Sequence, residues 1–231
     1  MTRITKHLDD LKLRIGAAAD AAGRDVNDIT ILAVSKRQNV DAIHEAANAG
    51  LTAMGESYVQ EAVEKIRVLG PNLEWHFIGR PQANKTRAIA EHFQWVHTVA
   101  SPRIAERLSR QRPAILDPLN ICVQICSDPD LCHAGCSPDQ AKALCESIVD
   151  LPGLKLRGLM SFPFPLRGLE MQRKPFRQLR ELHDTLVNQG LELDTLSMGM
   201  SNDFEAAVME GSTMLRIGTA LFGPRDEQSV T

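Results

Sequence analysis

The feature that most constrains the fold of this chain is an alternation of strand-like and helix-like segments that occurs eight times. The strand-like segments are short apolar or alternating runs, and the segments between them have helical periodicity. Such alternation implies parallel βα units, and eight of them imply a closed (β/α)8 barrel. The expected strands are 31–34, 51–54, 73–78, 95–99, 119–125, 154–160, 195–196 and 214–217.

Helical periodicity also precedes the first strand, in residues 1–23, so we expect an extra N-terminal helix. We predict an α/β fold consisting of one TIM-barrel domain over residues 1–231. The competing arrangement is an open doubly wound sheet, but no Gly-x-Gly-x-x-Gly turn follows the first strand. Residues 163–175 are the least regular, and we expect a mobile loop there. The expected later helices are 40–49, 58–69, 84–92, 101–110, 138–149, 176–189, 203–210 and 219–222.

Composition and charge exclude several classes of protein. The net charge is −3 and the basic residues are spread along the chain, so no surface for nucleic acid is indicated. No apolar run reaches the roughly 18–20 residues of a membrane span, and the first ten residues do not form a signal peptide. Five cysteines without a secretory signal predict reduced thiols and a cytoplasmic protein.

A lysine at the end of the first strand is the first candidate for chemistry. Ile31 to Val34 form a short apolar strand, and Lys36 follows it directly. An ammonium held among apolar residues tends to lose its proton, and a neutral amine attacks carbonyl carbons. The alternative is that Lys36 simply begins a solvated loop, as lysines at strand ends often do.

A candidate anion site lies in the last two loops of the predicted barrel. Barrel enzymes often bind phosphate with the loops after strands seven and eight and with the start of a short helix. Here these loops carry Ser201, Gly218 and Thr219. Their hydroxyl and backbone N–H groups suit a phosphate, although a glycine such as Gly218 can also be a plain turn residue. A phosphate and an amine on one rim suggest a phosphorylated aldehyde, and pyridoxal 5′-phosphate is the leading candidate.

Other polar residues are less easily assigned. Arg216 lies inside an apolar strand, where a guanidinium needs partners, and a cofactor ring nitrogen is one candidate. His76, between Trp75 and Phe77, is more typical of a satisfied core or rim histidine. One further group could suggest a zinc site: Cys126, Cys132, His133 and Cys136. These residues lack the paired Cys-x-x-Cys spacing of zinc ligands, so we predict no metal site.

Six separated motifs resemble the pyridoxal-phosphate homeostasis protein family (YggS/PROSC type) across nearly the whole chain. They occur here in the order in which they occur in that family. The matching stretches are 33–36 (AVSK), 55–61 (GESYVQE), 75–79 (WHFIG) with 82–85 (QANK), 157–160 (RGLM), 196–201 (LSMGMS), and 216–219 (RIGT) with Phe222-Gly223.

The resemblance implies a barrel related to the N-terminal domain of alanine racemase. It implies that Lys36 holds pyridoxal 5′-phosphate as a Schiff base. It also implies that Ser201, Gly218 and Thr219 contact the phosphate, and that Arg216 faces the pyridine nitrogen.

Three further residues in the matching motifs, Met198, His76 and Ser57, complete the expected cofactor-binding set. The chain also departs from the family pattern at several positions, and Ser57 is one of them, because asparagine is usual there. The other departures are Pro81 in place of leucine, Cys126 in place of asparagine and His133 in place of lysine.

The expected function is to hold the cofactor in intracellular vitamin B6 homeostasis, and no residue is assigned a catalytic role. Racemisation needs an acid/base group on each face of the substrate carbon, whereas this chain has one tyrosine, Tyr58. The alternatives are a weak amino-acid racemase, then a Schiff-base aldolase for a phosphorylated sugar, and last a metal-dependent binder. The expected partners are the cofactor and apo-enzymes that require it, with no nucleic acid or membrane, and we expect a monomer.

Overall fold

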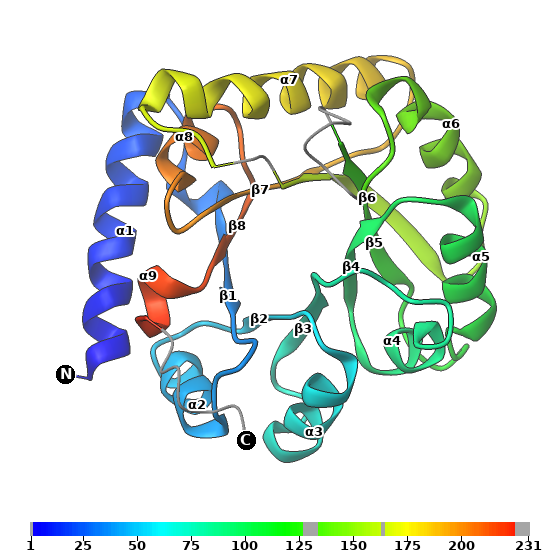
Figure 1. Cartoon of the computed structure of the whole chain (residues 1–231), viewed down its shortest axis with the longest axis horizontal. Helices are drawn as coiled ribbons and strands as arrows, with labels where there is room; N and C mark the ends of the chain where they lie inside the picture. The colour runs from blue at the N-terminus through cyan, green and yellow to red at the C-terminus, as the bar shows by residue number, and fades with distance from the viewer. Residues whose placement is uncertain (1, 127–133, 163–164, 225–231) are drawn as a thin grey trace.

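Eight parallel strands close into a barrel in the computed structural model, which describes residues 2–126, 134–162 and 165–224 (Figure 1). Each strand pairs with the next along the chain, and β1 also pairs with β8. The predicted (β/α)8 barrel is therefore confirmed. The strands are β1 (Thr30–Val34), β2 (Ala53–Glu56), β3 (Glu74–Phe77), β4 (Trp95–Val99), β5 (Leu119–Ile125), β6 (Leu154–Ser161), β7 (Thr195–Met200) and β8 (Met214–Ile217).

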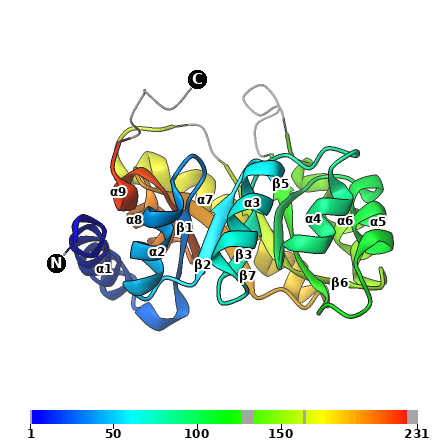
Figure 2. The ribbon, with the colours of Figure 1, turned by 90° about the horizontal axis from the view of Figure 1, so that it is seen from below.

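Helices surround this barrel, as the two perpendicular views show (Figures 1 and 2). The extra N-terminal helix is confirmed: α1 precedes β1 and packs against α2, α8 and α9. A short 3-10 turn, Val26–Asp28, joins α1 to β1. The α-helices are α1 (Arg3–Ala21), α2 (Val40–Asn48), α3 (Val59–Leu69), α4 (Thr86–His92), α5 (Pro102–Gln111), α6 (Pro138–Val149), α7 (Leu169–Asn188), α8 (Phe204–Met209) and α9 (Thr219–Phe222).

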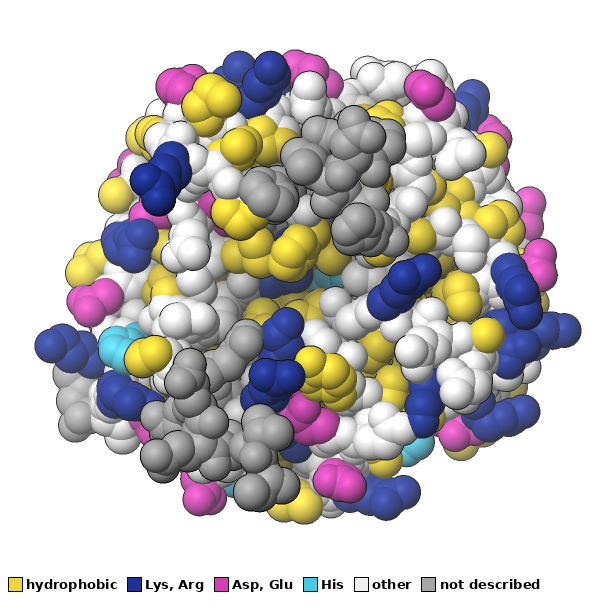
Figure 3. All heavy atoms as spheres, in the orientation of Figure 1, with side chains coloured by type: hydrophobic (Ala, Val, Ile, Leu, Met, Phe, Trp, Pro, Cys, Tyr) yellow, Lys and Arg dark blue, Asp and Glu magenta, His cyan; other side chains and the backbone are white. Residues whose placement is uncertain are grey.

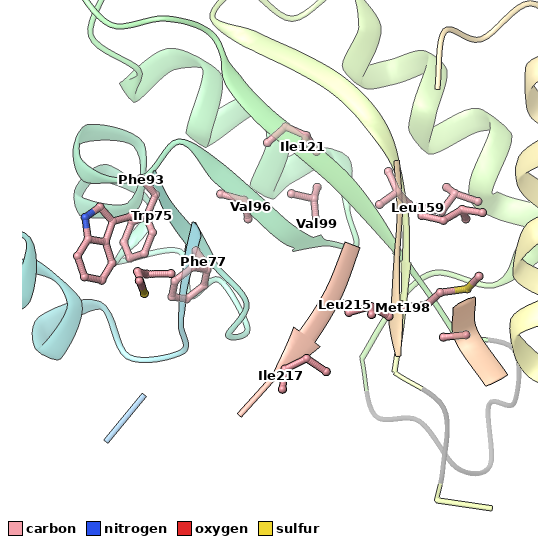
Figure 4. Close-up of a cluster of buried hydrophobic side chains, with 14 of the residues drawn as sticks. Trp75, Phe77, Phe93, Val96, Val99, Ile121, Leu159, Met198, Leu215 and Ile217 are labelled. Carbon is pink, nitrogen blue, oxygen red and sulfur yellow. The ribbon is translucent and has the colours of Figure 1, made fainter. Parts of the chain in front are cut away.

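The main core lies between the barrel and the helices. Successive side chains of a strand point to opposite faces, so one set of each strand packs outward and the other fills the barrel. Figure 4 shows part of the outward set, including Phe77, Val96, Ile121 and Leu215. A smaller apolar cluster from the strands is separate from this core; it consists of Leu32, Ala53, Trp95, Cys122, Met160 and Met214.

The region predicted as a loop over residues 163–175 differs from the structure in its second part. Helix α7 begins at Leu169 and contains Pro175, whereas the sequence predicted a helix from residue 176. Arg173, Arg177 and Arg180 lie on one side of α7, and all three pair with the buried carboxylate of Glu210. These tertiary contacts support the helix on both sides of a residue that usually interrupts one.

Strand β7 is also longer than the predicted 195–196 and reaches Met200. The serine and glycine residues of this segment favour a loop on composition alone. In the structure Gly199 has φ of 93°, and a Cβ built there would lie 2.5 Å from the Cβ of Ala207. The backbone of β7 can therefore adopt this conformation, where the pairing with β8 shifts register, because residue 199 is a glycine.

The cysteines depart in part from the prediction of reduced thiols. Cys122, Cys136 and Cys145 are free and buried, but Cys126 is disulfide-bonded. Burial raises the pKa of the Cys122 thiol to about 12, so this group is a small apolar side chain at neutral pH.

No helix within the described residues has both the length and the apolar character needed to cross a lipid bilayer.

The close contact of β6 with β7 generates a stability prediction. A Cβ on Gly158 would lie 1.8 Å from the carbonyl oxygen of Thr195, its partner on β7. Because this neighbour is backbone, Gly158→Ala must move a strand, and we expect it to lower the free energy of unfolding by about 3 kcal/mol or more. Urea or thermal unfolding measures the change.

Gly16→Ala is the matched control. Gly16 lies inside α1 with nothing within 4 Å of the added Cβ, so this change should stabilise the protein by up to about 1 kcal/mol. Equal effects of the two substitutions would contradict the close approach of β6 and β7.

Candidate functional site

A pocket of about 260 Å³ opens at the C-terminal end of the barrel. Figure 3 shows that this face is hollowed at its centre, with hydrophobic and basic side chains around the hollow. Five of the residues predicted from the sequence line the pocket: Lys36, Ser201, Arg216, Gly218 and Thr219. A larger open groove of about 880 Å³ lies on the opposite face, but barrel sites form where the βα loops meet, which favours the smaller pocket.

Lys36 is half-buried and follows β1 after the buried Ser35. The backbone is held on both sides of it. Before it, the Nζ of Lys65 donates to the carbonyl oxygen of Ser35 at 2.7 Å. After it, the N–H of Arg37 donates to a carboxylate oxygen of Glu61, and Arg37 has φ of 61°. A non-glycine residue in this conformation carries strain, so these contacts fix a backbone that would otherwise relax.

A buried charge cluster supplies those contacts. The Nζ of Lys65 lies 2.7 Å from Oε1 of Glu56 and 2.6 Å from Oε1 of Glu61, and the Lys65 residue is only 6% exposed. Ser35 Oγ also donates to Oε1 of Glu56, at 2.7 Å. Burial raises the pKa of the Glu56 carboxyl, and the adjacent Lys65 ammonium acts in the opposite direction.

Glu56, Glu61 and Lys65 were not predicted from the sequence to have a role in the site. The signals were present: Glu61 and Lys65 have the i,i+4 spacing of a helical ion pair, and both glutamates lie in the GESYVQE motif. The sequence did not show that α3 places Glu61 and Lys65 in contact with the end of β1.

Arg216 lies under the pocket on β8 and is 3% exposed. Its Nη1 donates to the carbonyl oxygen and to Oγ of Ser197, the latter at 2.8 Å, and its Nη2 donates to the carbonyl oxygen of Ser161 at 2.7 Å. These three acceptors are neutral. Burial therefore lowers the pKa of the guanidinium to about 10, and the nearby Asp203 carboxylate acts in the opposite direction.

Ser201 joins the loops after β7 and β8. Its Oγ accepts from the backbone N–H of Ala220 at 3.1 Å, which brings it beside the start of α9 at Gly218 and Thr219. The three residues predicted for an anion site are thus neighbours on one side of the pocket, and Lys36 lines the same pocket.

The other predicted site residues lie outside the described lining of the pocket. His76 is inside the barrel, with its ring stacked on Trp95 at a centroid distance of 5.3 Å. Met198 is fully buried in the hydrophobic core, as Figure 4 shows, because its neighbour Ser197 points into the barrel. Ser57 is half-buried at the end of β2, and its carbonyl oxygen approaches Gly79.

Phe162 and Leu166, which lie between β6 and α7, line one side of the pocket. The Nε2 of Gln172 donates to the carbonyl oxygens of Leu166 and Asn202. The amide of Gln172 therefore joins Leu166 to the loop that follows β7.

Among residues 2–126, 134–162 and 165–224, no group of three or more His, Cys, Asp and Glu side chains is placed to hold a metal ion. Cys132 and His133, which the sequence analysis considered with Cys126 and Cys136, lie outside the described residues.

The chain is similar to known proteins over most of its length. Residues 7–226 match the family described as alanine racemase, N-terminal domain. The chain is 51% identical to the pyridoxal phosphate homeostasis protein of Pseudomonas aeruginosa, over 98% of this chain and 97% of that one. It is 46% identical to the protein of the same name from Escherichia coli K12, over 98% of each chain.

Among solved structures, the fold is similar to PipY of Synechococcus elongatus PCC7942 with PLP bound. The TM-score is 0.84 and the sequence identity is 35%, and the match covers 96% of this chain and all of that one.

The buried charge cluster generates the second prediction. Lys65→Met removes the cation and leaves the Glu56 carboxylate buried without its partner. We expect a loss of about 3–5 kcal/mol in the free energy of unfolding, measured by urea denaturation at pH 7. Adding Glu56→Leu to this variant should restore most of the loss, because neither charge then remains to be desolvated.

Lys142→Met provides the control. Lys142 pairs with Glu146 at 3.8 Å on the exposed face of α6, and its loss should cost less than about 1 kcal/mol. If Lys65→Met were as mild as Lys142→Met, the cluster would not have the role assigned here.

Proposed function

The chain belongs to the alanine racemase N-terminal domain family and, within it, to the pyridoxal phosphate homeostasis proteins; from this premise we propose that it binds pyridoxal 5′-phosphate (PLP) and acts in intracellular PLP and vitamin B6 homeostasis. One observation carries the proposal. A single pocket gathers an amine, a buried guanidinium and a hydroxyl-and-glycine loop pair, from Lys36, Arg216, Ser201, Gly218 and Thr219.

The pocket suits PLP in its chemistry. Val34, Ile78 and Phe162 supply apolar surface for an aromatic ring. A Cβ on Gly218 would lie 3.5 Å from the Cβ of Val34, so a side chain at this position would occupy space between the two loop ends. Glycine keeps that space open, and a phosphate can approach the backbone there.

We assign to Lys36 the Schiff-base linkage to the cofactor. When bound, PLP supplies an aldehyde that condenses with a primary amine and a ring that withdraws electrons. The contribution of the chain is position: Ser35 and Arg37 are held by Lys65 and Glu61, so the residue between them enters the pocket from a fixed backbone. We assign supporting positions, not contacts, to Ser57, His76 and Met198.

Arg216 is the group we place opposite the ring nitrogen. A guanidinium donates hydrogen bonds and accepts none, so it does not stabilise a protonated ring. An unprotonated ring is a weaker acceptor of electrons, and this favours holding the cofactor over turning over a substrate.

The alternative function is that of a weak amino-acid racemase, but the position of Tyr58 does not support it. Racemisation needs a second acid/base group across the substrate carbon. The one tyrosine of the chain is 47% exposed, and its hydroxyl accepts from Nη2 of Arg37 at 3.4 Å. It is not among the described residues that line the pocket. Exchange of the substrate α-hydrogen, compared between wild type and Lys36→Ala, tests this alternative.

We propose that apo-enzymes requiring PLP receive the cofactor, and that the protein acts as a cytoplasmic monomer. Light scattering tests the monomer, and gain of activity by an apo-enzyme mixed with the loaded protein tests the transfer.

Covalent labelling tests the linkage. We expect protein loaded with PLP to be yellow, and borohydride to fix close to one cofactor per chain on the peptide that contains Lys36. Mass spectrometry after digestion measures the site and the stoichiometry. A label spread over other lysines of the wild type, or no uptake of the cofactor, would refute the assignment of Lys36.

A charge placed in the anion site tests the other end of the cofactor. Ser201→Asp puts a carboxylate beside the expected phosphate, and we expect it to weaken PLP binding about 100-fold or more through repulsion. Binding of pyridoxal, which lacks the phosphate, should change little. Ser201→Thr keeps the hydroxyl and is the control. Equal losses for PLP and pyridoxal would show that the phosphate lies elsewhere.

A further inference from the structure

A chain of hydrogen-bonded side chains crosses the inside of the barrel beneath Arg216. Nη1 of Arg216 contacts Ser197 Oγ at 2.8 Å, and this hydroxyl contacts Nδ1 of His97 at 2.8 Å. Nε2 of His97 contacts Nδ1 of His76 at 2.9 Å, and Nε2 of His76 contacts a carboxylate oxygen of Glu74 at 3.0 Å. The five residues come from β8, β7, β4 and β3.

The two end residues of this hydrogen-bonded network, Arg216 and Glu74, lie toward opposite ends of the barrel. Arg216 lines the pocket, whereas Glu74 is the first residue of β3, at the opposite end of the barrel. The Glu74 side chain is 46% exposed, while His76, His97 and Ser197 are fully buried. The chain therefore connects the floor of the proposed cofactor site to a carboxylate in contact with solvent.

The end groups, together with neutral imidazoles at His76 and His97, fix the direction of every hydrogen bond. A guanidinium only donates, so Ser197 Oγ accepts from Arg216 and has its own proton to give to Nδ1 of His97. His97 must then carry its proton on Nε2 and donate it to His76. His76 in turn carries its proton on Nε2 and donates it to Glu74. With both imidazoles neutral, each is therefore the Nε2–H tautomer.

Electrostatics agree with neutral imidazoles. Burial lowers the pKa of His97 well below its usual value, and the neighbouring His76 and Arg216 lower it further. Burial also lowers the pKa of His76, although Glu74 opposes that effect. The other charged or titratable groups facing the chain are Arg157 near Glu74, and Asp203 and Cys122 near Arg216.

We propose that Ser197, His97 and His76 form a directional relay of positioning residues that links the Glu74 carboxylate to Arg216 and so sets the charge that Arg216 presents to the ring of the bound cofactor. The acceptors of Arg216 are neutral, and no carboxylate within the described part of the chain bonds directly to its cation. Aligned hydrogen bonds polarise one another in a low-dielectric interior, so the relay gives this cation a remote counter-charge.

The donor and acceptor roles of the hydrogen bonds in the relay are a property of the protein alone and do not depend on a bound cofactor. The effect of the relay on the cofactor rests on the proposed function, so the experiments below separate the two.

The first experiment reads the tautomers in protein free of PLP. Long-range 1H–15N correlation spectra of protein labelled at histidine should show His76 and His97 as neutral Nε2–H tautomers from about pH 6 to pH 8. An Nδ1–H tautomer or an imidazolium at His97 would overturn the direction of the relay, whether or not the protein binds PLP.

The second experiment compares His97→Gln with His97→Leu. Glutamine can still accept from Ser197 and donate to His76, whereas leucine of similar size can do neither. We expect His97→Leu to weaken binding of PLP about tenfold and His97→Gln to stay within about twofold of wild type. Equal losses, or no loss in either variant, would overturn the relay.

Ser197→Ala provides a second break in case His97→Leu does not fold. It removes the hydroxyl that joins Arg216 to His97, and it should reproduce the roughly tenfold loss. Wild-type affinity in Ser197→Ala would equally count against the proposal.

Glu74→Gln isolates the charge, because glutamine can still accept from His76 while the carboxylate is lost. Losing a negative charge favours deprotonated forms, so the pH midpoint of the visible band of bound PLP should move down by about half a pH unit. The tautomers of His76 and His97 should stay unchanged. An unmoved midpoint would overturn the electrostatic link, and absence of any visible band in the wild type would instead refute the proposed function.

Discussion

The pairing of β1 with β8 is the constraint on which the site depends. Leu32 lies opposite Arg216 and Ala33 opposite Ile217, so closure of the barrel joins the first and last strands in register. Lys36 and Gly218 follow the first and the last strand, so they are far apart in the sequence but lie on the same rim of the barrel. An open sheet of the same strands would leave them at opposite edges, and neither group would line a shared pocket.

The barrel accommodates two buried cations by different means. Lys65 has direct contacts with Glu56 and Glu61, so its charge is neutralised where it is desolvated. Among the residues that the structure describes, Arg216 has only neutral acceptors at hydrogen-bond distance. Burying a cation without a bonded carboxylate is unfavourable, and a structure retains it where a ligand or a polar network repays part of the cost. This difference is why Lys65 is assigned to the backbone of Lys36 and Arg216 to the contents of the pocket.

Local pattern was sufficient to predict the fold and part of the site. The strands Trp95–Val99 and Leu119–Ile125 agree with the prediction to the residue, because their β-rich segments are bounded by clear breaks. The gathering of Lys36, Ser201 and Gly218 followed from the rule that barrel sites form at strand ends. Helix α7 was missed at its start because its support comes from Glu210, which lies far away in sequence. Contacts of that kind leave no trace in local periodicity.

Strand parity explains why the inner polar residues were harder to predict than the rim. Once β7 is known to continue to Met200, Ser197 must face the barrel and Met198 the helices. The sequence prediction ended this strand at Leu196, so it assigned neither residue to the inner or the outer face of the barrel. The sequence did not point to His97, because the partners of a histidine in a strand cannot be identified before the register of the neighbouring strands is known. His97 contacts His76 on β3 and Ser197 on β7, and Ser197 lies 100 residues after His97 in the sequence. The residues that line a barrel site can thus be predicted from the order of the strands, whereas the residues that connect them inside the barrel require the register as well.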